Sequence, residues 1–291
     1  MVEPEQSTSL NNMATDFEIK DRRGTPPGWV DAYPTDAIEQ LLAALPASNV
    51  YALIDNAYDG SFAGRCQHRF PGILSRSLYE GRYDGPGLSE IAPTLLRVPD
   101  EPQERFTFLA FLLRETSGRP MLSFLHSNGL SADPFSHLRN QMEAVDHEGT
   151  AFLIRLADTN ALDAVLEVFT DTQRSRFLAG IQWWYFRRNG TLRCVSDGAS
   201  GVEEADGTPY MCTAEQMEQL QTLARPGAML NLVRNSPHIF GTLVGLPSQA
   251  YACIQAVLHA ASPESPMHDA VVVRKITAAL NDAGLLQPHA A

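Results

Sequence analysis

Residues 151–184 constrain the fold more than any other stretch, because they predict a strand, two helices and a second strand in close succession. The apolar run at 152–156 is typical of a strand that is covered on both faces. Asp158 or Thr159 can cap the helix that follows, and a second strand is predicted at 181–188. The first helix has an apolar face at helical spacing, formed by Leu162, Val165, Leu166 and Phe169. This order of elements predicts a layered α/β unit around which the N-terminal two-thirds of the chain packs.

Similar patterns continue on both sides of this unit. Compact apolar runs predict further strands at 50–55, 77–79, 94–98 and 121–125. Helical spacing predicts further helices that begin near residues 35, 62, 104 and 133, the first of them with Asp36 and Glu39 in a capping box. The dipeptide Asn189-Gly190 between two strand patterns is typical of a tight hairpin, so at least one edge of the sheet should be antiparallel. We therefore expect an α/β (α+β) lobe with a mixed sheet flanked by helices.

The composition divides the chain into four parts. Residues 1–28 form a polar N-terminal arm without a periodic pattern, and residues 29–197 form the α/β domain. Residues 198–210, rich in Gly, Ser, Asp and Glu, are predicted to be a linker. Residues 211–291 are predicted to be a smaller all-α helical lobe, with helices near 213–234, 237–244, 247–260 and 267–283.

Charge and cysteine content narrow the class of protein. The formal net charge is −12, which disfavours nucleic acid and anionic membranes as partners because both repel an acidic surface. No apolar run approaches the roughly 20 residues that a membrane-spanning helix needs. The first ten residues contain acids and lack the apolar core of a secretory signal. None of the four cysteines forms a Cys-x-x-Cys pair, so we expect reduced thiols in a cytoplasmic protein.

One group of residues is compatible with an enzyme. Ser123 and His126 lie at the end of a predicted strand, where open α/β sheets place ligand sites. With Asp55 or Asp158 as the orienting acid, they are a candidate nucleophilic triad, although no Gly-x-Ser-x-Gly motif surrounds the serine. The glycine-rich motifs that bind nucleotide phosphates are missing. A small-molecule enzyme of open α/β type is therefore the alternative interpretation.

Two acid–histidine groups offer candidate metal ligands. Asp133 and His137 have helical spacing, and residues 146–148 read Asp-His-Glu. No second histidine-rich pair accompanies either group, so we expect neither a metal nor a cofactor. Arg155 and Asp158 flank a predicted strand–helix junction, and we expect them to form a structural ion pair.

The aromatic run Trp183, Trp184, Tyr185 and Phe186 is the strongest candidate for binding a partner. On a strand, successive side chains point to opposite faces, so Trp183 and Tyr185 share one face and the other two share the second. If the strand lies near an edge of the sheet, one of these faces is only partly covered and offers a hot spot. The alternative is that helices of the same chain cover both faces.

Four blocks of sequence, taken in order, resemble a known family. They are VYALIDNA at 50–57, SLYEGRYDGPGLSEIAPTLLRV at 77–98, GRPMLSFLHSNGLSADPFSHLRNQM at 118–142 and AFLIRLADTNALDAVLEVFTDTQRSRFLAGIQWW at 151–184. At these spacings the chain resembles the adaptor chaperones of the bacterial type VI secretion system, the Tap/Tec/VasW-like domain of unknown function. The positions that match the family pattern are Asp55, His137, Arg155, Asp158 and Gly180.

The resemblance implies a function without catalysis. Such adaptors bind the N-terminal region of a toxic effector in the cytoplasm and help to place it on the VgrG spike. The resemblance thus implies a secreted effector and the VgrG spike as partners, no cofactor, and a structural role for the five matching residues. A two-lobed protein with a flexible linker could clamp an apolar helix of such an effector in a groove.

Overall fold

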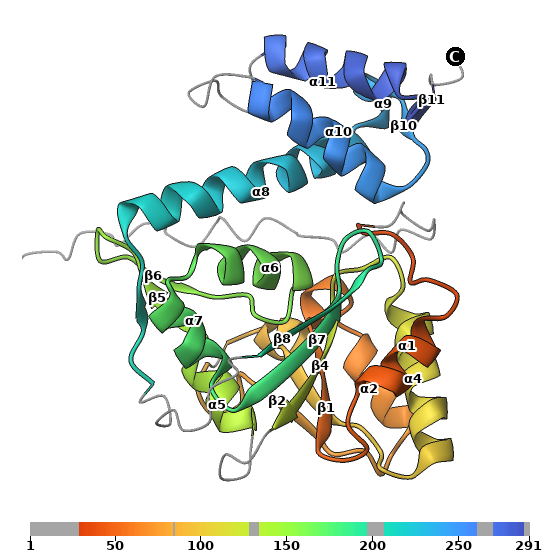
Figure 1. Ribbon diagram of the computed structural model, residues 1–291, viewed down its shortest axis with the longest axis vertical. Helices are drawn as coiled ribbons and strands as arrows, with labels where there is room; N and C mark the ends of the chain where they lie inside the picture. Colours follow the sequence, from red (N-terminus) through yellow and green to blue (C-terminus); the bar gives the residue numbers. More distant parts are fainter. Residues whose placement is uncertain (1–28, 84, 128–133, 197–206, 261–269, 288–291) are drawn as a thin grey trace, which may run out of the picture.

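The structure is a computed structural model that describes residues 29–83, 85–127, 134–196, 207–260 and 270–287. The predicted N-terminal arm lies outside these residues, as does most of the predicted linker, and the domain boundaries stay predictions. The described residues form an α/β lobe and a smaller, mainly helical lobe (Figure 1). The predicted fold class is therefore confirmed, with the differences given below.

Six strands form the main sheet, in the order β2-β3-β1-β4-β7-β8. Their bounds are β1 Val50–Ile54, β2 Ser75–Ser77, β3 Thr94–Arg97, β4 Leu122–Ser127, β7 Ile181–Phe186 and β8 Leu192–Ser196. Each neighbouring pair is antiparallel. The main sheet is therefore antiparallel, whereas a mixed sheet was predicted. The predicted hairpin at Asn189-Gly190 is confirmed and makes β8 the edge strand, which leaves β7 inside the sheet.

Helices cover both faces of the main sheet (Figure 1). One face packs against α1 Ala37–Ala44, α2 Phe62–Arg69 and α4 Pro102–Thr116. The other packs against α5 Pro134–Asn140, α6 Thr159–Val168 and α7 Asp171–Leu178. The described part of this lobe also contains two short helices, η1 Asn56–Tyr58 directly after β1 and α3 Leu88–Ile91. The aromatic strand β7 contributes to both cores, because alternate side chains point to opposite faces.

A smaller sheet replaces the buried strand predicted at 152–156. It has the order β6-β5-β9, with bounds β5 Glu143–Val145, β6 Ala151–Leu153 and β9 Tyr210–Met211. Strand β6 is only three residues long, and its first and last side chains are exposed. Ile154 and Leu156 are buried as expected, but they follow the strand. The prediction of a core strand here was wrong, because the strand that forms, β6, pairs with β5 in the smaller sheet and not with the main sheet.

The long helix α8 Ala214–Asn235 joins the two lobes (Figure 1). Its first half packs on the α/β lobe through Met217 and Leu220, whereas Met229 and Leu230 in its second half belong to the core of the small lobe. Pro226 lies between the halves, where it removes one helical hydrogen bond.

The small lobe is completed by α9 Pro237–Phe240, β10 Thr242–Leu243, α10 Pro247–Ala260, α11 Ala270–Asp282 and β11 Leu286–Gln287. The predicted helix at 237–244 ends early because its last residues enter β10, which pairs with β11. The lobe is therefore mainly helical but not all-α. No helix among the described residues of either lobe combines the length and apolar character needed to cross a membrane.

Candidate functional site

A cavity of about 820 Å³ lies between the two lobes. Its walls come from the start of α6, the turn after β7, the middle of α8 and the start of α10. We call it the interlobe cavity, and its lining residues include Arg155, Asp163, Arg188, Gly227, Asn231 and Tyr251. Its size falls within the roughly 300–1,000 Å³ that is usual for ligand pockets in proteins.

One wall of the interlobe cavity is built on a network of charged groups at the end of β1 and the start of α6. Arg155 donates from Nη2 to Asp55 Oδ2 at 2.7 Å, and its Nη1 lies 3.4 Å from Asp158 Oδ2. The hydroxyl of Tyr58 donates to Asp158 Oδ2 at 2.8 Å. The structural ion pair predicted for Arg155 and Asp158 is present, and Asp55, which lies 100 residues before Arg155, completes it.

The same carboxylates hold the local backbone. Asp55 accepts a hydrogen bond from Ala57 N and caps η1, while Asp158 Oδ1 accepts from the amides of Asn160 and Ala161 and caps α6. Burial raises the pKa of Asp158 above its usual value, although Arg155 opposes the shift. Burial raises the pKa of Tyr58 as well, and the neighbouring Asp158 carboxylate adds to the effect. Tyr58 therefore stays a hydrogen-bond donor at any ordinary pH.

A second network lies on the side of the cavity formed by the β7–β8 hairpin. Asp163, on α6, accepts from the Tyr185 hydroxyl at 2.7 Å and from Arg187 Nε at 2.9 Å, and it also pairs with Arg193. Burial and the nearby Asp163 carboxylate raise the pKa of Tyr185. The charge of Arg187 is thus matched by a carboxylate of its own lobe, as that of Arg155 is.

Arg188 differs from these two arginines. Its Nη1 donates to the backbone carbonyl of Trp29 at 3.0 Å, and its guanidinium carbon lies 4.0 Å from the centre of the Tyr251 ring. Among the residues that the structure describes, no carboxylate lies within ion-pair distance of Arg188. Burial lowers the pKa of the guanidinium, which nevertheless remains a cation at neutral pH.

Polar contacts hold the lobes together around the cavity. Ser248, in α10, donates from its amide and its hydroxyl to the two oxygens of Asp31 at 2.8 and 2.6 Å. Gln216, near the start of α8, donates to the carbonyl of Val168 at 3.1 Å and to Gln173 Oε1 at 2.7 Å. Together with the packing of α8 on α6, these contacts hold the two lobes in place on either side of the cavity.

The enzyme interpretation receives no support from the geometry. Ser123 is fully buried, and its hydroxyl accepts a hydrogen bond from Trp183 Nε1 at 2.9 Å. His126 is three residues further along the same strand, so its side chain points to the opposite face of the sheet. The proposed orienting acids, Asp55 and Asp158, are engaged with Arg155 instead.

The candidate metal ligands are also separated. Asp133 lies outside the described residues, and His137 Nε2 lies 2.9 Å from the carbonyl oxygen of Phe177, to which it hydrogen bonds. Asp146 accepts from the amides of Glu148 and Thr150, as in a tight turn. Within the described ranges, no group of three or more His, Cys, Asp or Glu side chains is arranged to hold a metal ion.

The aromatic run of β7 is not available at the surface. Trp183 and Tyr185 are buried under α6 and α7, and Trp184 and Phe186 are buried under the helices of the opposite face. The condition for the predicted partner site, a partly uncovered face, is thus not met, because β8 and not β7 forms the edge. Gly180 adopts a φ of 65° between α7 and β7, a backbone conformation that favours glycine.

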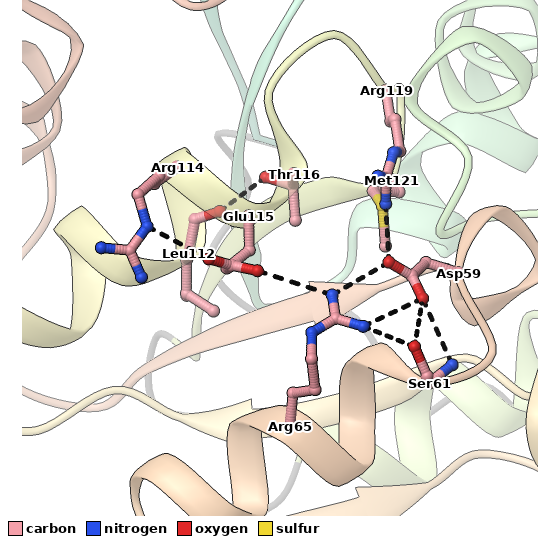
Figure 2. Close-up of polar contacts among 9 residues, drawn as sticks. All are labelled: Asp59, Ser61, Arg65, Leu112, Arg114, Glu115, Thr116, Arg119 and Met121. Carbon is pink, nitrogen blue, oxygen red and sulfur yellow. Dashed lines mark hydrogen bonds and ion pairs between the residues drawn. The ribbon is translucent and has the colours of Figure 1, made fainter. Parts of the chain in front are cut away.

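A second polar cluster lies away from the interlobe cavity, where the loop after β1 meets the end of α4 (Figure 2). Asp59 pairs with Arg65 at 2.9 Å and with Arg119 at 2.7 Å, and Arg65 also approaches Glu115 at 3.6 Å. Burial raises the pKa of Asp59, but the hydrogen bonds from Arg65, Ser61 and Arg119 outweigh it and hold the pKa well below its usual value. Each charge in the cluster has a partner, so its role is to brace two loops.

Comparisons with known proteins agree with part of the resemblance. No curated protein and no solved structure matches the chain. Residues 50–176 match the model of a family that is described as a domain of unknown function, DUF4123. The matched region runs from β1 into α7 and includes Asp55, His137, Arg155 and Asp158. The match covers the greater part of the α/β lobe and does not extend into the small lobe.

Proposed function

We propose that the protein is an adaptor chaperone of a type VI secretion system. It binds the N-terminal region of a toxic effector in the cytoplasm and assists the loading of that effector onto the VgrG spike. The proposal includes no chemical step, no metal and no cofactor. It is supported by the DUF4123 match, since the matched residues contain three of the four blocks that resemble this family of adaptors and most of the fourth.

The observation that carries the proposal is the interlobe cavity. Two folded lobes border an open cavity of about 820 Å³ with both polar and apolar walls, and one long helix connects the lobes. Such a space suits a segment of another polypeptide better than a reaction, because among the described residues the serine, histidine and acid side chains that a hydrolase needs do not converge there. The charged network of Asp55, Arg155 and Asp158 gives one wall a fixed shape.

Co-expression tests the proposal. The chain is produced together with the toxin that is encoded beside it, and the mixture is examined by size-exclusion chromatography with light scattering. We expect one complex that contains both proteins and that is retained by immobilised VgrG spike. A toxin without its N-terminal region is the matched control and should elute separately. Failure of every adjacently encoded toxin to form a complex would contradict the proposal.

A further inference from the structure

Arg188 is a cation of the interlobe cavity that pairs directly with no carboxylate of the described residues. Arg155 and Arg187 line the same cavity, and each pairs with a carboxylate at 2.7–2.9 Å. Arg188 has only a carbonyl oxygen and an aromatic ring as close partners within the described part of the chain. The carboxylates of Asp158 and Asp31 attract Arg188 without forming an ion pair with it. A guanidinium taken partly out of water gains free energy from a direct ion pair, so an anion that enters the cavity has a partner there.

The surroundings of Arg188 leave room for such an anion. Gly227, on α8, faces the guanidinium, and a Cβ atom added there would lie 3.9 Å from Arg188 Nη2. The Tyr251 hydroxyl makes no hydrogen bond to the described residues and can donate one to a ligand. Burial raises the pKa of Tyr251, so the hydroxyl keeps its proton at neutral pH. A planar guanidinium beside a hydroxyl donor is well suited to a carboxylate.

Other features of the cavity limit the kind of anion. The amides at the start of α6 are not available, because Asp158 already accepts from Asn160 N and Ala161 N. The wall also contains the acids Asp163 and Glu167, and the whole chain carries a formal net charge of −12. These groups repel a ligand with several phosphates more strongly than a segment with one carboxylate, so a single carboxylate is the better match for Arg188.

We propose that the interlobe cavity is the binding site for the effector's N-terminal region and that Arg188 pairs there with one Asp or Glu carboxylate of that segment. This inference rests on the proposed function, from which it takes the bound polypeptide. Arg188 then acts as the anchor that fixes the register of the segment, and Tyr251 supports the same carboxylate.

Variants at two neighbouring arginines test the pairing. Arg188→Met keeps much of the side-chain volume and removes the charge, and we expect it to weaken effector binding by about 10- to 100-fold in titration calorimetry. Arg188→Lys keeps the charge but not the planar, two-pronged donor group, so its affinity for the effector should lie between those of the wild type and Arg188→Met. Arg187→Met is the matched control, because Arg187 lines the cavity but is already paired with Asp163, and it should change the affinity by less than about threefold.

A second measurement does not depend on the folding of an arginine variant. A photo-crosslinking amino acid is placed at Asn231 or Gln255, which line the cavity, and at Gln67 on α2 as a control. In the purified complex, the two cavity positions should crosslink to one effector segment that contains an acid, and Gln67 should not. Replacing that acid by its amide should weaken binding to the wild-type chain as much as Arg188→Met does, with no further loss when the two changes are combined.

The outcomes separate the two proposals. If the wild-type chain forms no complex, the proposed function fails. If the complex forms but Arg188→Met binds equally well, or the cavity positions crosslink only to residues 1–28 of the same chain, the assignment of the interlobe cavity is overturned and the adaptor function stands.

Discussion

Replacing Asp158 by alanine should destabilise the α/β lobe, because this one carboxylate serves three groups. It caps α6 through two amide hydrogen bonds, and loss of such a cap costs about 0.5–2 kcal/mol. It also accepts from Tyr58, and a buried hydroxyl left without a partner costs about 1–3 kcal/mol. The ion pair with Arg155 adds less than about 1 kcal/mol, since Arg155 is half exposed and keeps Asp55.

These contributions are partly offset, because the carboxylate itself is buried and burial raises its pKa. We therefore expect Asp158→Ala to lower the free energy of unfolding by about 2–4 kcal/mol. Asp158→Asn is the matched control. Asparagine caps helices as well as aspartate does, so this variant should lose clearly less stability than the alanine variant.

Urea denaturation followed by tryptophan fluorescence measures the effect in the correct lobe, because Trp29, Trp183 and Trp184 all lie outside the small lobe. A double-mutant cycle with Tyr58→Phe isolates the hydrogen bond, and a coupling energy of about 1.5–3 kcal/mol is expected for a bond to a charged group. A loss below about 0.5 kcal/mol for Asp158→Ala, together with no coupling to Tyr58, would refute the role assigned to this network.

Three further predictions concern single side chains. Ser123→Ala removes the acceptor of the buried Trp183 Nε1–H and should cost about 1–3 kcal/mol of unfolding free energy in the same urea assay; an unchanged midpoint would contradict the hydrogen bond. Gly227→Ala should stabilise α8 by about 0.5–1 kcal/mol in calorimetric melting, because the added methyl group meets only the end of Arg188; a lower melting temperature would contradict this. Asp59→Asn should lower the free energy of unfolding by a constant amount above about pH 5, and the difference from wild type should shrink as the pH falls below about 4. The reason is that the pKa of Asp59 is lowered in the folded state, so its stabilising contribution is lost when the carboxyl is protonated. A difference that grows in acid would reverse the assigned sign.

Elements with strong local signals could be predicted from the sequence. The apolar stripe at Leu162 and Leu166 with Asp158 as its cap predicted α6, and the structure has that helix with that cap. Asn189-Gly190 predicted the β7–β8 hairpin, because only a tight turn of this kind matches the twist of two paired strands. The alternation of the aromatic run between two faces also followed from strand geometry alone.

The errors have tertiary causes. The expected capping box at Asp36 and Glu39 does not form, because the Asp36 carboxylate accepts from Gln40 Nε2 at 3.0 Å instead of from the helix amides. Of the apolar run at 152–156, Ile154 and Leu156 are buried, but beside the main sheet and not within it, since strand order is decided by long-range pairing. The same strand order covers Trp184, which local reasoning could leave exposed.

The candidate site was only partly accessible to sequence reasoning. Arg155 and Asp158 are three residues apart, so their pairing could be expected, and the resemblance added Asp55. Arg188, Gly227 and Tyr251 meet only because two lobes dock against each other. No periodic pattern or short motif marks a contact of this kind. The sequence does show a cluster of arginines around the hairpin. It does not show that Arg187 pairs with a carboxylate and that Arg188 does not.

Hydrogen exchange on the adaptor with and without the effector's N-terminal region tests the central claim most directly. If the segment lies between the lobes, binding should slow amide exchange at the start of α6, in the turn at 187–189 and in the facing parts of α8 and α10. Exchange in α1, α2 and α4, on the far face of the sheet, should stay unchanged. Protection confined to that far face, with the residues around Arg188 and Tyr251 exchanging as in the free protein, would contradict the account.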